Sequence, residues 1–193
     1  MNNSGPAVPV PAASVPEVSG ATAQDYIDRL CLIVQDFPRP GISFRDLTPV
    51  FGDGPAFRAV VDQLLEPFAG TFDLVAGIEA RGFLLAAAVA YATGTGVVAV
   101  RKPGKLPRPV LSESYSLEYG EAVLEIHQDD VAPGTRVLVL DDVLATGGTL
   151  AAATALFESC EAEVVGCAVV LELQALQGRQ KVQQHRVHAV ASF

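Results

Sequence analysis

The sequence contains few of the residues on which several classes of protein depend. It has no tryptophan, one methionine and 3 cysteines in 193 residues, and only 18% of its residues are charged. Cys31, Cys160 and Cys167 are odd in number and have no metal-ligand spacing, so we expect three small buried side chains in a reducing compartment. Because 50% of the residues are hydrophobic, the chain can close a core of its own as one domain of ordinary size.

Basic residues are also scarce. The chain has 13 Lys and Arg against 22 Asp and Glu, which gives a net charge of −9. Its average field repels polyanions, so we expect no nucleic acid partner and no anionic membrane partner. A phosphorylated ligand would instead require a local set of hydrogen-bond donors.

The first 20 residues lack Lys and Arg and contain four prolines. They have neither the basic start nor the continuous apolar stretch of a signal peptide, and their composition predicts a disordered leader over 1–20. Residues 83–100 are uncharged, but Thr-Gly-Thr-Gly at 93–96 interrupts them, which favours a helix, a turn and a strand over a membrane span. We therefore expect a cytoplasmic protein with a single domain over 21–193.

Short apolar runs alternate with helical patterns along this domain. Strands that are apolar throughout and separated by helices indicate an α/β fold with a mainly parallel central sheet flanked by helices. Residues 102–121 have no helical period and predict a flexible lid loop, and the alternation at 122–127 predicts a hairpin arm. The expected strands are 74–78, 97–100, 136–140, 164–171 and 187–191, and the expected helices are 23–35, 55–68, 83–91 and 149–160.

One predicted strand-to-helix junction, at 141–149, combines acidic residues with glycines. Ligands of open α/β sheets bind beyond the carboxyl ends of the strands, and the unpaired N–H groups at the start of a helix attract an anion. The Thr-Gly-Gly-Thr segment at 146–149 therefore predicts a monophosphate cradle. Asp141 and Asp142 would repel phosphate, so they suit sugar hydroxyls or a divalent cation. Together the two features predict a sugar phosphate site; the alternative is an Asp helix cap with a Gly-rich turn.

A second junction follows the strand predicted at 74–78. Arg81 can hold a phosphate through two hydrogen bonds, and Lys102 and Lys105 lie on the predicted loop. Taken alone, Arg81 is equally well explained by a surface ion pair. Combined with the first junction, it predicts a substrate that is phosphorylated at both ends.

Five segments carry a family resemblance. Residues 137–149 (VLVLDDVLATGGT) resemble the 5-phosphoribosyl-1-pyrophosphate signature of the type I phosphoribosyltransferases. The other four are similar to the adenine-specific branch of that family: 37–46 (FPRPGISFRD), 79–83 (EARGF), 101–107 (RKPGKLP) and 115–120 (YSLEYG).

The resemblance implies the type I phosphoribosyltransferase fold, with a small hood near 37–50 and the C-terminus. It also implies transfer of the phosphoribosyl group from 5-phosphoribosyl-1-pyrophosphate to adenine, which gives AMP and pyrophosphate in purine salvage. The displacement at ribose C1 would pass through an oxocarbenium-like state. Mg²⁺ is the implied cofactor, held mainly by substrate and water rather than by protein ligands, and a homodimer is the implied assembly.

The same resemblance assigns roles to individual residues. Asp141 and Asp142 would bind the ribose hydroxyls. The 5-phosphate would be bound by Ala145, Thr146, Gly147, Gly148 and Thr149. The pyrophosphate would be bound by Glu79, Ala80, Arg81 and Lys102. Further contacts with the substrate would come from Arg101 and Lys105. The backbone of Ser43 and Arg45 would read the base edge, and Phe44 and Leu173 would sandwich the ring. The catalytic set is Arg81, Lys102, Glu118 and Tyr119.

Glu118 is the expected acceptor of the proton that adenine loses, because a carboxylate on a closing lid can act as a general base. A solvated loop glutamate is the alternative. Two other functions stay open: a regulator that binds the sugar pyrophosphate without catalysis, and an enzyme that acts on a 6-oxopurine. The regulator would need an added nucleic-acid-binding module, and the acidic net charge opposes one.

Overall fold

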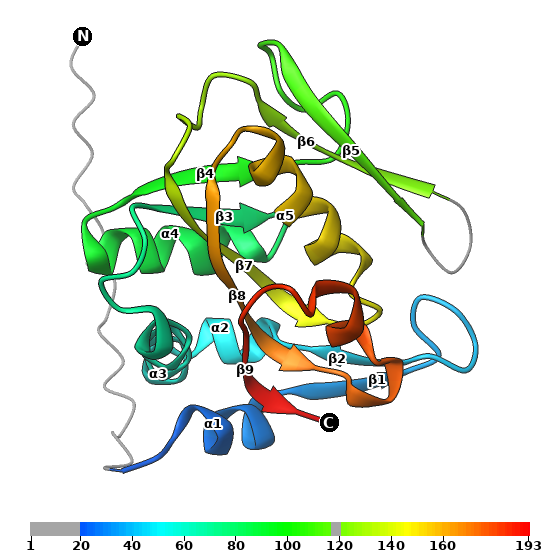
Figure 1. The fold of residues 1–193 in the computed structure, drawn as a ribbon. Coiled ribbons are helices and arrows are strands. Elements are labelled where there is room, and N and C mark those ends of the chain that lie inside the picture. Colours follow the sequence, from blue (N-terminus) through cyan, green and yellow to red (C-terminus); the bar gives the residue numbers. More distant parts are fainter. Residues whose placement is uncertain (1–19, 117–120) are drawn as a thin grey trace, which may run out of the picture.

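A five-stranded sheet lies at the centre of the protein (Figure 1). The computed structural model describes residues 20–116 and 121–193, so most of the predicted leader lies outside the described residues. All neighbouring strands of the sheet pair in parallel, in the order β4-β3-β7-β8-β9. This confirms the predicted α/β class. The strands are β3 (Leu74–Ile78), β4 (Gly96–Val100), β7 (Arg136–Leu144), β8 (Glu163–Glu172) and β9 (Val187–Ser192).

Both faces of the sheet are covered, each by its own core. Along β7, Leu138 and Leu140 pack with the core formed by α1 to α4, whereas Val137 and Val139 pack with α5. This alternation follows from the period of two of a strand and explains why residues 137–140 of β7 are all apolar. The helices are α1 (Ala23–Leu30), α2 (Thr48–Gly52), α3 (Gly54–Leu65), α4 (Gly82–Thr93) and α5 (Gly148–Ser159), with the 3₁₀ turns η1 (Glu66–Phe68), η2 (Gln174–Leu176) and η3 (Gly178–Val182).

Two antiparallel pairs stand apart from the main sheet. The first joins β1 (Leu32–Gln35) to β2 (Ser43–Asp46), and α2 follows within the range where the sequence predicts a hood. Near it, the Arg45 guanidinium lies 3.7 Å from the centre of the Phe193 ring. The second pair, β5 (Val110–Ser116) and β6 (Glu121–His127), forms an arm beside α5 (Figure 1).

The structure corrects three predicted boundaries. The helix expected over 23–35 ends at Leu30, because Cys31 is extended and Ile33 pairs with Arg45 across the β1–β2 ladder. The loop expected over 102–121 contains β5, whose residues up to Ser116 pair with β6. The strand expected to end at residue 140 continues to Leu144.

The uncharged stretch at 83–100 forms the predicted helix, turn and strand. Its helix α4 has 12 residues and ends where Gly94 takes the left-handed conformation, with φ +70°, before β4. Among the residues that the structure describes, no helix is long and apolar enough to cross a membrane.

The order of the strands determines where a ligand can bind. The chain adds β4 on one side of β3, then crosses over and adds β7, β8 and β9 on the other side. The connections after β3 and after β7 therefore leave the sheet in opposite directions, which opens a crevice at their carboxyl ends. Both predicted junctions, 79–82 and 141–149, lie at this switch point.

Candidate functional site

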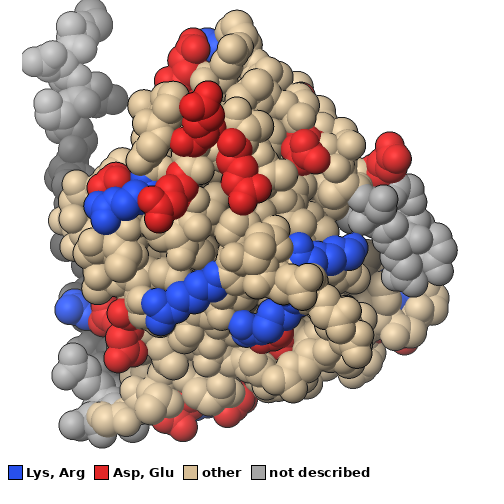
Figure 2. Space-filling view, viewed as in Figure 1, with Lys and Arg blue, Asp and Glu red and all other residues tan. Residues whose placement is uncertain are grey.

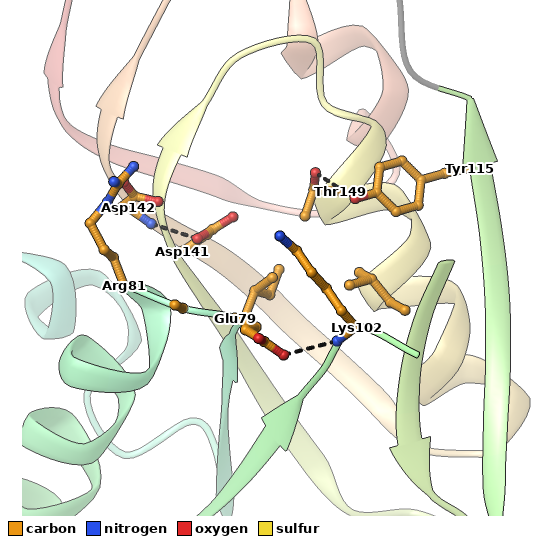
Figure 3. A pocket seen from close by; sticks show the side chains of 10 residues that line it. Glu79, Arg81, Lys102, Tyr115, Asp141, Asp142 and Thr149 are labelled. Carbon is orange, nitrogen blue, oxygen red and sulfur yellow. Dashed lines mark hydrogen bonds and ion pairs between the residues drawn. The ribbon is translucent and has the colours of Figure 1, made fainter. Parts of the chain in front are cut away.

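A pocket of about 290 Å³ lies at the carboxyl ends of β3, β4 and β7 (Figure 3). It brings together residues that are far apart in the sequence and come from both predicted junctions and the predicted lid region. All the lining residues except Ile78, Tyr115 and Leu124 are site residues predicted from the sequence. The lining consists of Ile78, Glu79, Ala80, Arg81, Lys102, Tyr115, Leu124, Asp141, Asp142 and Thr149.

An ion pair joins the two junctions inside the pocket. The Arg81 Nε donates to Oδ2 of Asp142 at 2.5 Å, and the two side chains lie together at one side of the pocket (Figure 3). The ion pair considered as an alternative for Arg81 therefore exists, but its partner is another predicted site residue. The Arg81 guanidinium also lies 5.5 Å from the centre of the Phe44 ring.

A close backbone approach allows this contact between the junctions. A Cβ added to Gly82 would lie 2.8 Å from the carbonyl oxygen of Leu140. Any other residue at this position would push the start of α4 away from β7. Gly82 thus keeps Arg81 within reach of Asp142.

Asp141 is buried at the end of β7, with an exposure of 8%. Burial raises the pKa of its carboxyl well above the usual value, and the neighbouring Asp142 raises it further, while the Asp142 N–H and Arg81 act in the opposite direction. The Asp142 N–H donates to Oδ1 of Asp141 at 2.8 Å. A buried carboxyl with so few donors suits hydroxyl groups brought by a ligand.

Glu79 holds the chain that follows β4. Its Oε2 accepts from the Lys102 N–H at 3.0 Å and from Arg101 Nε at 3.3 Å, and the Lys102 N–H is the main reason that the pKa of Glu79 is lowered. From this anchor the Lys102 side chain runs into the pocket toward Asp141 and Thr149 (Figure 3). Arg101 also donates to the carbonyl oxygen of Lys105 at 3.3 Å, and the Lys105 side chain is exposed outside the pocket lining.

The predicted phosphate cradle is the turn from β7 into α5. Gly147 has φ +78°, Gly148 begins the helix, and no side chain caps the helix start. The N–H groups of the first turn are therefore available to an anion. Of the five residues predicted here, Thr149 lines the pocket, whereas Ala145, Thr146, Gly147 and Gly148 lie on the turn beside it.

The residues predicted to bind the base lie outside the lining of this pocket. Ser43, Phe44 and Arg45 are in β2, and the Phe44 ring packs edge-on against Phe37 with centroids 5.1 Å apart. The Leu173 N–H donates to the carbonyl oxygen of Leu144 at 2.9 Å, next to the end of β7. The predicted lid residues, Glu118 and Tyr119, lie outside the described residues.

Ile78, Tyr115 and Leu124 line the pocket but were not predicted as site residues. Tyr115 pairs with Ala122 in the arm, and Thr149 Oγ1 lies 3.5 Å from its hydroxyl. The alternating pattern at 122–127 already indicates that Leu124 faces inward. Only the register of β5 against β6, however, shows that Tyr115 shares that face.

Charges are unevenly distributed on the surface. On the face shown in Figure 2, acidic side chains gather in the upper part and recur at the lower left and along the bottom, and several Lys and Arg side chains form a short band across the middle. Uncharged surface separates these basic side chains. On this face, the basic side chains of the band thus do not merge into one continuous basic patch.

Comparisons with known proteins agree with this geometry. The phosphoribosyl transferase domain family matches residues 53–191. An adenine phosphoribosyltransferase of Renibacterium salmoninarum is 64% identical over 167 residues, which cover 86% of this chain and 92% of that protein. The adenine phosphoribosyltransferase structure from Thermoanaerobacter pseudethanolicus has a TM-score of 0.86 at 44% identity, over 89% of this chain and 100% of its own.

A third relative was solved with bound ligands. It is the adenine phosphoribosyltransferase of Saccharomyces cerevisiae in complex with adenine and an imino-altritol bisphosphate. Its TM-score is 0.82 at 36% identity, with 87% of this chain and 97% of that chain covered. The chain therefore belongs to the type I phosphoribosyltransferase family, among the adenine phosphoribosyltransferases.

Proposed function

We infer that this protein transfers the 5-phosphoribosyl group of 5-phosphoribosyl-1-pyrophosphate to adenine, forming AMP and pyrophosphate. The observation that carries this inference is the 64% identity to an adenine phosphoribosyltransferase across nearly all of the domain. The pocket is chemically suited to the reaction, because paired carboxylates, two cations and an uncapped helix start meet at one edge of the sheet.

We propose that the sugar phosphate binds along the end of β7. Asp141 and Asp142 would accept hydrogen bonds from the ribose hydroxyls, and the turn at 145–149 would hold the 5-phosphate through its N–H groups and the hydroxyls of Thr146 and Thr149. The burial of Asp141 and the uncapped start of α5 support these roles.

We propose that Arg81 and Lys102 bind the pyrophosphate, with the backbone of Ala80 beside them. Cations held at the leaving group stabilise the charge that develops as the bond to ribose C1 breaks. Glu79 would act mainly by fixing Lys102, since its carboxylate already accepts hydrogen bonds from Lys102 and Arg101. Lys105 would approach from the exposed side of the loop.

Mg²⁺ is the cofactor that we propose to accompany the pyrophosphate. The described residues include no group of three or more His, Cys, Asp and Glu side chains that could hold a metal ion. The donor set fits an ion held mainly by substrate oxygens and water, to which Asp141 and Asp142 would offer nearby carboxylate oxygens. When bound, Mg²⁺ would neutralise charge on the departing pyrophosphate.

Adenine would stack between Phe44, which lies on β2, and Leu173, which follows β8. The Arg45 N–H and the Ser43 carbonyl would read its N1 and 6-amino edge. We further propose that Glu118 and Tyr119 close over the site, exclude water and accept the proton that adenine loses.

We propose a homodimer as the assembly and the cytoplasm as the location. An apolar face supports the dimer, since Leu84 and Tyr91 on α4 and Val97 on the neighbouring edge strand β4 are more than half exposed. Light scattering should give the mass of two chains for the wild type, and the mass of one chain for Tyr91→Glu.

The three free cysteines suit the reducing compartment that we propose as the location.

A direct product assay tests the proposed reaction. Purified protein is incubated with adenine, 5-phosphoribosyl-1-pyrophosphate and Mg²⁺, and AMP and pyrophosphate are measured by chromatography. We expect the two products in equal amounts. Tight binding of the sugar pyrophosphate without AMP would instead identify the non-catalytic regulator and contradict the proposal.

A further inference from the structure

We propose that Gly178 and Arg179 are positioning residues for the ribose 5-phosphate site, because the backbone of η3 is in direct contact with the backbone of the turn at 145–147. This inference rests on the proposed role of that turn. It extends the functional region to 174–182, which the sequence analysis did not include.

The contact is a backbone-to-backbone approach of two buried glycines. A Cβ added to Gly178 would lie 2.1 Å from the carbonyl oxygen of Ala145 and 2.8 Å from the Gly147 nitrogen. Conversely, a Cβ added to Gly147 would lie 2.1 Å from the Gly178 carbonyl oxygen. Real Cβ atoms essentially never approach other atoms closer than 3.0 Å, so neither glycine tolerates a side chain unless one backbone moves.

Arg179 holds η3 in this position. Its Nε and Nη2 donate to the two carboxylate oxygens of Glu172 at 2.9 and 2.5 Å, and its Nη1 donates to the Val187 carbonyl oxygen at 2.7 Å. Glu172 is 7% exposed at the end of β8. A bidentate ion pair of this kind fixes the orientation of the guanidinium as well as its distance from the carboxylate. Arg179 therefore connects η3 to both β8 and β9.

Further contacts fix both ends of the segment. At its start, the Leu173 N–H donates to the Leu144 carbonyl oxygen, immediately before the phosphate turn. At its end, Val182 is fully buried in the core that contains α5. Segment 174–182 is thus anchored in the same core as α5, the helix whose N–H groups would hold the phosphate.

Phosphate recognition by backbone N–H groups depends on the exact position of the backbone. The N–H groups cannot be re-aimed by a change of side-chain rotamer, and Gly147, which has no side chain, leaves the backbone of the turn with more conformational freedom than any other residue would. A displacement of about 1 Å at a positioning contact can cost on the order of 100-fold in rate. We infer that the rigidity of this glycine-rich turn comes from η3.

Ribose 5-phosphate and pyrophosphate serve as separate probes of the site. Isothermal titration should show that Gly178→Ala raises the dissociation constant for ribose 5-phosphate by about tenfold or more, while that for pyrophosphate changes by less than about twofold. Gly52→Ala is the matched control, since no atom lies within 4 Å of a Cβ at that position. It should leave both constants unchanged.

A second variant keeps the test valid if Gly178→Ala does not fold. Arg179→Lys retains the positive charge near Glu172 but loses the two-pronged geometry, so it should raise the ribose 5-phosphate constant in the same direction and by less. Equal losses for both probes, or none in either variant, would overturn the proposal. Thr149→Val is the reference: if it leaves ribose 5-phosphate binding unchanged, the assignment of the phosphate turn itself is wrong.

Discussion

Arg81 and Asp142 form an ion pair at 2.5 Å although they lie 61 positions apart in the chain and the family resemblance assigns them to different parts of the substrate. The Arg81 side chain is 38% exposed and the Asp142 side chain 11%. Without substrate, each group is thus partly neutralised by the other. In the binding mode that we propose, the sugar pyrophosphate exchanges this pair for contacts of Arg81 with pyrophosphate and of Asp142 with ribose.

Asp142→Asn should therefore weaken the binding of one half of the substrate without weakening that of the other. Ribose 5-phosphate should bind more weakly by roughly 1.5–3 kcal/mol, as expected for a lost charged hydrogen bond. Pyrophosphate should bind equally well or up to about fivefold more tightly, since a partly exposed ion pair competes with it by at most about 1 kcal/mol. Isothermal titration measures both constants.

Asp73→Asn is the matched control for this experiment. It removes an ion pair of the same kind, between Asp73 and Arg136, at the opposite ends of the same two strands. We expect it to leave both constants unchanged. Parallel weakening of the two ligands in Asp142→Asn would show that Arg81 and Asp142 do not serve separate groups.

Asp141 should reduce the stability of the protein at neutral pH. Its pKa is raised in the folded state, so the folded protein binds the proton more tightly than the unfolded chain does. The stabilising contribution of the protonated Asp141 carboxyl is therefore fully present below its pKa in the unfolded chain, about 3.9. It is lost as the pH rises through its higher pKa in the folded protein. Asp141→Asn removes this loss, and its Oδ1 can still accept the Asp142 N–H.

We expect Asp141→Asn to melt at least about 2 °C higher than the wild type at pH 7 and to lose sugar-pyrophosphate binding. The difference in melting temperature should shrink as the pH falls toward 4. A variant that is less stable at pH 7 would show that the Asp141 carboxylate stabilises the fold.

Deleting residues 1–20 should leave catalysis and the melting temperature unchanged. The first helix, α1, is capped by Thr22 and Asp25, each of which accepts from the backbone N–H of the other, so its cap remains complete. A melting temperature within about 1 °C of the full chain is expected. A large decrease would show that the first 20 residues pack against the domain.

The sequence predicts the β-strands of the sheet well, because parallel strands buried on both faces are continuous apolar runs. The apolar run at 74–78 predicts both ends of β3 correctly. The pattern predicts the end of β7 four residues too early, at residue 140 instead of Leu144, since charged residues such as Asp141 and Asp142 are rarely buried in a strand. Likewise, the apolar pair Ile33 and Val34 fitted a helical period, and only pairing with β2 shows that it forms a strand.

The site could be predicted in its chemistry but not in its contacts. The residue types at 79–81 and 141–149 indicate a sugar phosphate, and the pocket brings members of both segments together. The pairing of Arg81 with Asp142 depends on the crossover between β3 and β7, and the contact between Gly147 and Gly178 depends on the path of η3. Neither has a local signal in the sequence.

Discrimination between purines tests the account most directly. Adenine presents an acceptor at N1 and a donor at its 6-amino group, whereas hypoxanthine presents a donor at N1 and an acceptor at C6. The Arg45 N–H and the Ser43 carbonyl would match adenine and oppose hypoxanthine at both positions. Because backbone groups cannot rotate to suit the other base, a site of this kind rejects the wrong base by ~10⁴ or more.

The measurement is kcat/KM for adenine and for hypoxanthine with saturating 5-phosphoribosyl-1-pyrophosphate and Mg²⁺, in the wild type and in Ser43→Val. The account predicts a preference for adenine of ~10⁴ or more that Ser43→Val preserves, since the backbone and not the side chain reads the base. Turnover of hypoxanthine by the wild type within about tenfold of adenine, a difference of about 1.4 kcal/mol, would contradict it.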